Sequence, residues 1–218
     1  MLAQYLGLSL KVTPGFDTAA NELSYFMILA FRRLLSTKKK NDYKIRPFAH
    51  WWSHQKTTEN LFRPVSFPDA LPRLGPNFHL IEGDFLKIQS LTPRIADAEF
   101  WKEDETKDGT FDFVVTLFFI DTSVNVFATL EQIHRLLRPG GIWINLGPLL
   151  WTGGAQSSLE LSYQEVIEAA TRIGFSIQPG VPNSVEAPRT VECQYTGDPN
   201  AMMRWTYKAE FWVAKKTK

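Results

Sequence analysis

The chain has 218 residues, enough for one α/β domain with a sizeable core, and its 44% hydrophobic and 22% charged content is typical of a soluble globular protein. Lys and Arg total 24 against 23 Asp and Glu, so no net field would attract nucleic acid or an acidic membrane surface. A single cysteine excludes an intrachain disulfide framework, and neither a membrane span nor a signal peptide is recognisable, so we expect a cytoplasmic or also nuclear protein.

The first part of the chain predicts two strands and one helix. A short apolar strand is expected at Leu8–Val12, closed by a Pro-Gly turn, and a helix at Glu22–Leu35, where apolar residues recur at helical spacing. The segment Asn41–Leu71 is polar, aromatic and interrupted by prolines, so it is predicted to be mostly loop. Its length suggests that it lines or covers something. The next strand is predicted at Phe78–Glu82.

The rest of the chain alternates strands and helices. In chain order the predicted elements are a surface insertion at Arg94–Thr110, a strand at Phe111–Ile120, a helix at Val124–Leu137, a strand at Gly141–Leu146, a helix from Ser162 to Ile173, a short strand at Phe175–Gln178 and a final strand at Met202–Lys215. Ser162 and Glu165 form the capping-box pattern. The alternation predicts a parallel sheet, and the last two strands predict an antiparallel edge.

Acidic residues follow several predicted strands. Asp121 comes directly after an apolar strand, and in an open parallel sheet the ligand crevice lies outside the carboxyl ends of the strands. Glu22 and Asp84 also follow strands, where a carboxylate can accept hydrogen bonds from both ribose hydroxyls. An acid at the start of a helix is more often a partner of the helix dipole. Phe85, beside Asp84, could flank a purine.

Metal and nucleophile chemistry find little support. His50 and His54 have the spacing of a ligand pair, but no HExxH pattern accompanies them and Pro47 argues against a helix there. No GxSxG elbow is present, and Cys193 has no adjacent base. We therefore predict no metal site and no covalent nucleophile.

Aromatic residues are more numerous than packing requires, with seven tryptophans and six tyrosines. Several lie in predicted loops or at element ends: Trp51, Trp52, Trp151, Tyr195, Trp205 and Tyr207. An aromatic lining beside Asp121 would suit a cationic ligand group. Ordinary packing at the core and the sheet edge is the alternative for each of them.

A set of sequence strings covers nearly the whole chain in the order found in one known family. They are NELSYFM at Asn21, RPVSFPD at Arg63, GDF at Gly83, FFIDT at Phe118, LRPGGIWINLGPLL at Leu137, SLELSYQE at Ser158 and YTGDPNAMMRWTY at Tyr195. Through these strings the chain resembles the carnosine N-methyltransferase family, whose members use S-adenosylmethionine to methylate an imidazole nitrogen of a histidine-containing dipeptide.

The resemblance implies one methyltransferase domain over residues 1–218, with an α/β, class I methyltransferase-like (Rossmann-like) fold. Its sheet would be mostly parallel with an antiparallel C-terminal edge. The cofactor would be S-adenosyl-L-methionine and the partner a dipeptide or other small-molecule substrate, with neither nucleic acid nor membrane involved and a homodimer left open.

The resemblance also implies roles for individual residues. By position, cofactor contacts would come from Glu22 at the ribose, Asp84 and Phe85 at the adenine, and Thr116 and Leu117 beneath the methionine part. Substrate contacts would come from Asp121, Tyr195 and Tyr207, and we also predict one from Trp151, although the family pattern has no tryptophan there. Asp121 would be the catalytic residue, because a carboxylate that accepts one imidazole N–H leaves the other ring nitrogen unprotonated for attack. Positioning would supply most of the rate.

Two departures from the family pattern have consequences. The family places a histidine shortly after GPLL, where this chain has Trp151-Thr152-Gly153-Gly154, so carnosine itself is an uncertain substrate. The first strand and glycine-rich cofactor loop, which should precede NELSYFM by about twenty residues, are expected to be missing. We therefore predict weak cofactor binding. The alternatives are a non-catalytic family member acting as a binding or partner protein, and an incomplete or shortened form of an active enzyme.

Overall fold

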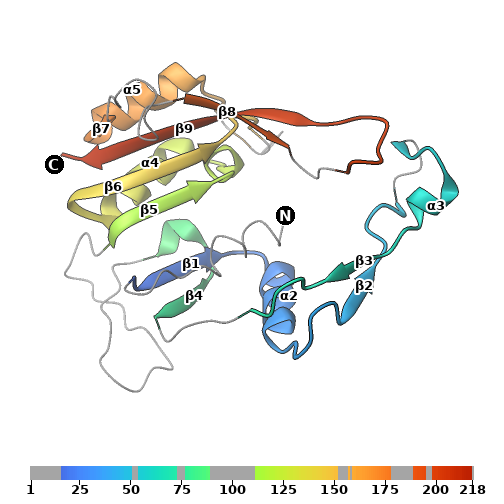
Figure 1. Ribbon diagram of the computed structural model, residues 1–218. Coiled ribbons are helices and arrows are strands. Elements are labelled where there is room, and N and C mark those ends of the chain that lie inside the picture. The colour runs from blue at the N-terminus through green and yellow to red at the C-terminus, as the bar shows by residue number, and fades with distance from the viewer. Residues whose placement is uncertain are drawn as a thin grey trace. The chain divides into compact units, whose positions relative to one another are not determined.

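The computed structural model describes residues 16–50, 54–72, 77–88, 111–151, 157, 159–177, 189–194 and 198–217 (Figure 1). The chain divides into a first unit, Met1–Phe85 with Gln194–Trp205, and a second unit, Leu86–Cys193 with Thr206–Lys218. The strand predicted at Leu8–Val12 and the insertion predicted at Arg94–Thr110 lie outside the described residues. One domain over residues 1–218 stays a prediction.

The first unit contains a parallel strand pair and a helix. Strands β1 (Thr18–Glu22) and β4 (Phe78–Glu82) pair in parallel register. Helix α2 (Tyr25–Leu35) begins after Ser24, whose hydroxyl accepts a hydrogen bond from the Met27 amide. The helix start predicted at Glu22 was therefore wrong. Residues 18–22 are a strand because each pairs with β4, a long-range contact that the small, polar sequence TAANE does not signal.

The segment predicted to be mostly loop contains three short elements. Strands β2 (Tyr43–Ile45) and β3 (Val65–Phe67) pair antiparallel, and helix α3 (Thr58–Leu61) lies between them in the chain. The described part of the segment is still mostly irregular, but these elements were not predicted, because three-residue strands are too short for alternation to be visible. They are stabilised by a contact that is long-range in sequence, the packing of the Tyr43 and Phe67 rings at 5.4 Å between centroids.

The second unit contains a five-stranded sheet with the order β5-β6-β9-β7, and β8 pairs with β9. The strands are β5 (Phe111–Leu117), β6 (Leu137–Gly147), β7 (Phe175–Ile177), β8 (Arg189–Gln194) and β9 (Thr206–Lys216). β5 and β6 are parallel, whereas β9 runs antiparallel to both β6 and β7 (Figure 1). The predicted parallel alternation and antiparallel C-terminal edge are confirmed. β8 was not predicted, because its sequence RTVECQ is largely polar.

Two helices contact one face of this sheet. Helix α4 (Val126–Leu136) is capped by Asn125, and α5 (Tyr163–Ile173) begins with the predicted capping box of Ser162 and Glu165. The strand registers place a set of fully or nearly buried side chains on the same face: Trp143, Asn145, Phe175, Trp212 and Ala214. Among the residues that the structure describes, no helix has both the length and the apolar character needed to cross a membrane.

Candidate functional site

Asp121 lies in a short 3₁₀ turn, Ile120–Thr122, that follows β5. The predicted strand ran to Ile120, but β5 ends at Leu117 because Phe118 adopts a positive φ of 50°, which breaks the extended run. The Phe118 amide still donates to the Leu146 carbonyl at 2.8 Å, so the turn remains fastened to β6.

The Asp121 carboxyl is buried, with 5% of the residue exposed. Its Oδ2 accepts a hydrogen bond from the Leu150 amide at 3.2 Å. Burial raises the pKa of Asp121 to about 6, well above its ordinary value, because desolvation disfavours the charged form, and the Leu150 N–H opposes this effect. A buried carboxyl with a pKa near neutrality is the kind of group found at ligand and catalytic sites.

Phe118 and Gly147, which sequence reasoning did not single out, shape the mouth of β5. The Phe118 ring packs edge-on against Tyr207 of β9, with 5.8 Å between centroids. A Cβ on Gly147 would lie 3.0 Å from the Phe118 Cα and N atoms, so only glycine permits this approach of β6 without a shift. Gly147 falls within the INLGPLL string. A glycine is required there because of the contact with Phe118, which is distant in sequence and which the string does not indicate.

Trp151 and Tyr207 are both described, and both are half-buried. The Trp151 indole N–H donates to the Leu161 carbonyl at 2.8 Å, which fixes the ring one residue after the Leu150 amide that binds Asp121. Tyr195 lies outside the described residues.

The Thr116 side chain is buried and forms hydrogen bonds within the core. The Trp143 indole N–H donates to the Thr116 hydroxyl at 2.8 Å, and that hydroxyl donates to Asn145 Oδ1, also at 2.8 Å. The residue is 3% exposed. A cofactor contact from this strand end would therefore come from the backbone or from the half-buried Leu117.

The first unit holds the other predicted cofactor residues at the carboxyl ends of its two parallel strands. Glu22 is the last residue of β1, not a residue several positions past a strand, and its Oε1 accepts from the Ser24 amide at 2.8 Å. The Gly83 amide donates to the Glu22 carbonyl at 3.0 Å, and Asp84 and Phe85 follow directly. A carboxylate such as that of Glu22 suits the hydroxyls of a ribose, and Asp84 lies at the same end of the parallel pair.

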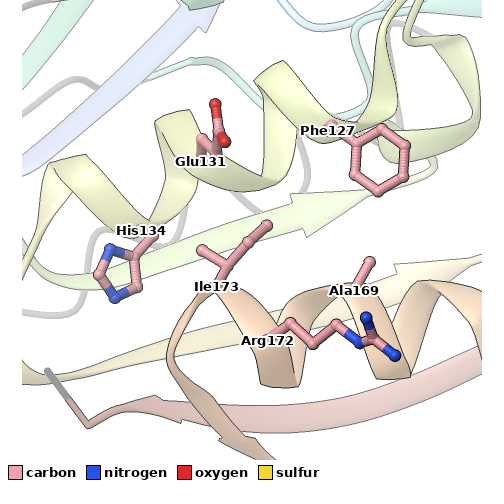
Figure 2. Close-up of a pocket in the computed structure, with 6 residues that line it drawn as sticks. All are labelled: Phe127, Glu131, His134, Ala169, Arg172 and Ile173. Atoms are coloured by element: carbon pink, nitrogen blue, oxygen red, sulfur yellow. The ribbon is translucent and has the colours of Figure 1, made fainter.

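A separate groove of about 470 Å³ lies between α4 and α5 in the second unit. Figure 2 shows its lining: Phe127, Glu131 and His134 from α4, and Ala169, Arg172 and Ile173 from α5. None of the predicted site residues that the structure describes lines this groove.

Comparison with known proteins places these residues in a family context. The model of the family described as carnosine N-methyltransferase matches residues 6–218. The carnosine N-methyltransferase of Schizosaccharomyces pombe is 32% identical over 94% of this chain and 54% of its own length. That of Rattus norvegicus is 33% identical over 93% of this chain and 46% of its own length. The chain thus spans about half the length of the curated relatives that it matches.

A solved structure supports the fold. An S-adenosylmethionine-dependent methyltransferase from Methanosarcina mazei superposes with a TM-score of 0.51, covering 98% of this chain and 86% of that one at 10% sequence identity. A likeness at this identity bears on the fold alone. The predicted α/β, Rossmann-like fold is confirmed.

Proposed function

This chain belongs to the carnosine N-methyltransferase family, and from that premise we propose that it is an S-adenosylmethionine-dependent N-methyltransferase. The acceptor we propose is an imidazole nitrogen of a histidine-containing dipeptide or a related small molecule. The observation that carries the proposal is the buried carboxyl of Asp121, positioned by the Leu150 amide at the carboxyl end of β5.

Asp121 can select the reactive form of the acceptor. In a neutral imidazole one ring nitrogen carries a proton and the other holds a lone pair. When the Asp121 carboxylate accepts the N–H, the tautomer is fixed and the second nitrogen is left free to attack. The half-buried Tyr207 ring, packed against Phe118, provides an aromatic wall in the same unit.

The cofactor residues fit the chemistry of a nucleoside. The Glu22 carboxylate, oriented by the Ser24 amide, is suited to accept hydrogen bonds from ribose hydroxyls, and Asp84 with Phe85 is suited to the adenine. S-adenosylmethionine, when bound, supplies an electrophilic methyl group on a sulfonium. With the cofactor bound, the imidazole lone pair would form the new N–C bond, and the electron pair of the broken S–C bond would remain on sulfur. The acceptor's remaining N–H proton can then pass to Asp121 or to water.

Methyl transfer to carnosine tests the proposal. The purified protein, incubated with carnosine, a second histidine-containing dipeptide or imidazole, should yield a product one methyl group heavier by mass spectrometry, provided that S-adenosylmethionine is in large excess to offset the weak cofactor binding predicted from the sequence. Asp121→Asn should lower kcat/KM on the order of 10²–10⁴-fold, the range typical of a positioned group that controls a proton. Asp112→Asn, which removes an exposed partner of Arg138, is the matched control and should leave the rate unchanged. Full activity of Asp121→Asn would refute the role of this carboxyl.

A further inference from the structure

The groove between α4 and α5 carries opposite charges on its two walls. Glu131 belongs to the α4 wall and Arg172 to the α5 wall. The apolar part of the lining comes from Phe127, Ala169 and Ile173 (Figure 2). All of these residues belong to the second unit, and α4 and α5 pack against each other within it. The groove is therefore formed by one unit alone.

The two opposite charges line the same groove without pairing. Within the described part of the chain, no ion pair joins the exposed Glu131 to Arg172. Arg172 Nη2 instead donates to Glu168 Oε1 at 2.6 Å, and these two side chains are 79% and 56% exposed. An exposed pair of this kind contributes little stability, and a guanidinium has five N–H donors. Arg172 can therefore bind a second carboxylate.

The helices hold the rest of the lining in place. Phe127 and Glu131 are one turn apart on α4, so an aromatic ring and a carboxylate lie on the same helix face. Phe127 is 44% exposed, which leaves its ring available to an apolar group. His134 lies toward the C-terminal ends of both helices, and its ring packs edge-on against Phe175 with 5.2 Å between centroids (Figure 2). The lining is therefore formed before any ligand binds.

A ligand that complements this lining has a positive group at one end, a negative group at the other and an apolar part between them. The axes of two packed helices are about 8–10 Å apart. A single amino acid carries both charged groups on one carbon atom and cannot reach both walls, whereas the termini of a dipeptide lie up to about 7 Å apart. The groove volume of about 470 Å³ is typical of small-molecule sites.

We propose that the groove between α4 and α5 is a second ligand site, which binds a dipeptide that has free termini and an apolar side chain. The ammonium group of the dipeptide pairs with Glu131, its carboxylate pairs with Arg172, and its side chain packs against Phe127. The dipeptide is held here as a ligand, and no bond is made or broken. The inference goes beyond the proposed function and does not depend on it.

Alanyl-leucine is a suitable probe, because it has both termini and an apolar side chain but no imidazole. When it is titrated onto isotope-labelled protein, the NMR signals of the α4 and α5 amides that line the groove should shift most. N-acetyl-alanyl-leucine lacks the ammonium group and alanyl-leucinamide lacks the carboxylate, so each should bind roughly tenfold more weakly. Leucine alone should also bind more weakly, because its charged groups cannot reach both walls.

Substitutions at exposed positions assign each contact without disturbing the core. Glu131→Gln should weaken alanyl-leucine binding roughly tenfold but leave binding of the N-acetyl analogue unchanged, because that analogue lacks the group that Glu131 binds. Arg172→Gln should show the same pattern with the amide analogue. Glu168→Gln should strengthen dipeptide binding, because it removes a carboxylate that competes for Arg172. Arg138→Gln breaks an exposed ion pair outside the groove and is the matched control.

Several results would overturn the second site. Unchanged α4 and α5 signals at millimolar alanyl-leucine would do so, as would equally tight binding of leucine or of either blocked analogue. Light scattering tests a second copy of the chain as the occupant: a dimer that Glu131→Gln dissociates would make the groove an interface between copies instead. None of these measurements uses methyl transfer, so a failure of the proposed function would leave their outcome unaffected.

Discussion

At the scale of single residues, the pH dependence of methyl transfer should report on Asp121. Burial raises the pKa of this carboxyl to about 6, and an imidazole acceptor titrates near the same pH. The reactive state needs both groups deprotonated, so log kcat/KM should rise with a limiting slope of about 2 below pH 5.5. In Asp121→Asn the residual activity should follow the acceptor alone, with a slope of about 1. Equal slopes in the two proteins would contradict this assignment.

The same carboxyl should lower stability at neutral pH. Its folded pKa is raised above the unfolded value, so the folded state binds more protons between about pH 4 and 6 and stability falls as pH rises through that window. Well above pH 6 the ionised Asp121 lowers the free energy of unfolding by a constant amount of about 2–3 kcal/mol. Asp121→Asn, whose amide oxygen can still accept from Leu150, should therefore melt higher than wild type at pH 8 but not at pH 4. A variant that melts lower at both pH values would show that the ionised Asp121 carboxylate does not destabilise the folded protein.

At the scale of elements, Lys216 completes the C-terminal end of α4. Its Nζ donates to the His134 and Leu137 carbonyls, both at 2.8 Å, and the residue is 7% exposed. A cation there satisfies buried carbonyls and interacts favourably with the helix dipole. Lys216→Met should lower the free energy of unfolding by about 1–3 kcal/mol in urea titration, because those carbonyls lose a donor. Lys215→Met, at the exposed neighbouring position, should have little effect, and equal effects of the two would argue against the cap.

The close approach of Gly147, at the end of β6, to Phe118 predicts that a larger residue at position 147 is destabilising. Gly147→Ala places a Cβ at 3.0 Å from two Phe118 backbone atoms, so the strand end must shift. We expect a loss of about 1–3 kcal/mol in unfolding free energy, in the range of overpacked sites. Because Phe118 precedes the turn that carries Asp121, methyl transfer should fall as well. A stable variant with full activity would show that the approach is not needed.

Elements with strong local signals were predictable, and those defined by long-range contacts were not. The strand Phe78–Glu82 was predicted with its observed bounds, and the helix that ends at Ile173 to within one residue at its start, because apolar runs and a capping box are local patterns. β1 is defined by pairing with β4, and its sequence carries no strand signal. For the same reason the position of Asp121 at a strand mouth was predicted, whereas its hydrogen bond from Leu150, 29 residues away, was not.

At the scale of the whole molecule, the two units differ in the size of their β-sheets. The second unit has five strands in one sheet, covered on one face by α4 and α5. Within the described residues the first unit has two sheets of two strands each. A two-stranded sheet is marginally stable alone, whereas three or more strands with a packed face sustain themselves.

Hydrogen exchange should therefore separate the units. Amides of β6 and β9, the strands that contain the buried Trp143 and Trp212, should exchange through global unfolding. Those of β1 and β4 should exchange faster through local opening. If Glu22 and Asp84 hold the nucleoside, saturating S-adenosylmethionine should slow exchange in β1 and β4 more than in β6, since a ligand stabilises the unit that binds it. Uniform protection along the chain, or ligand protection confined to the second unit, would place cofactor binding elsewhere than at these two carboxylates.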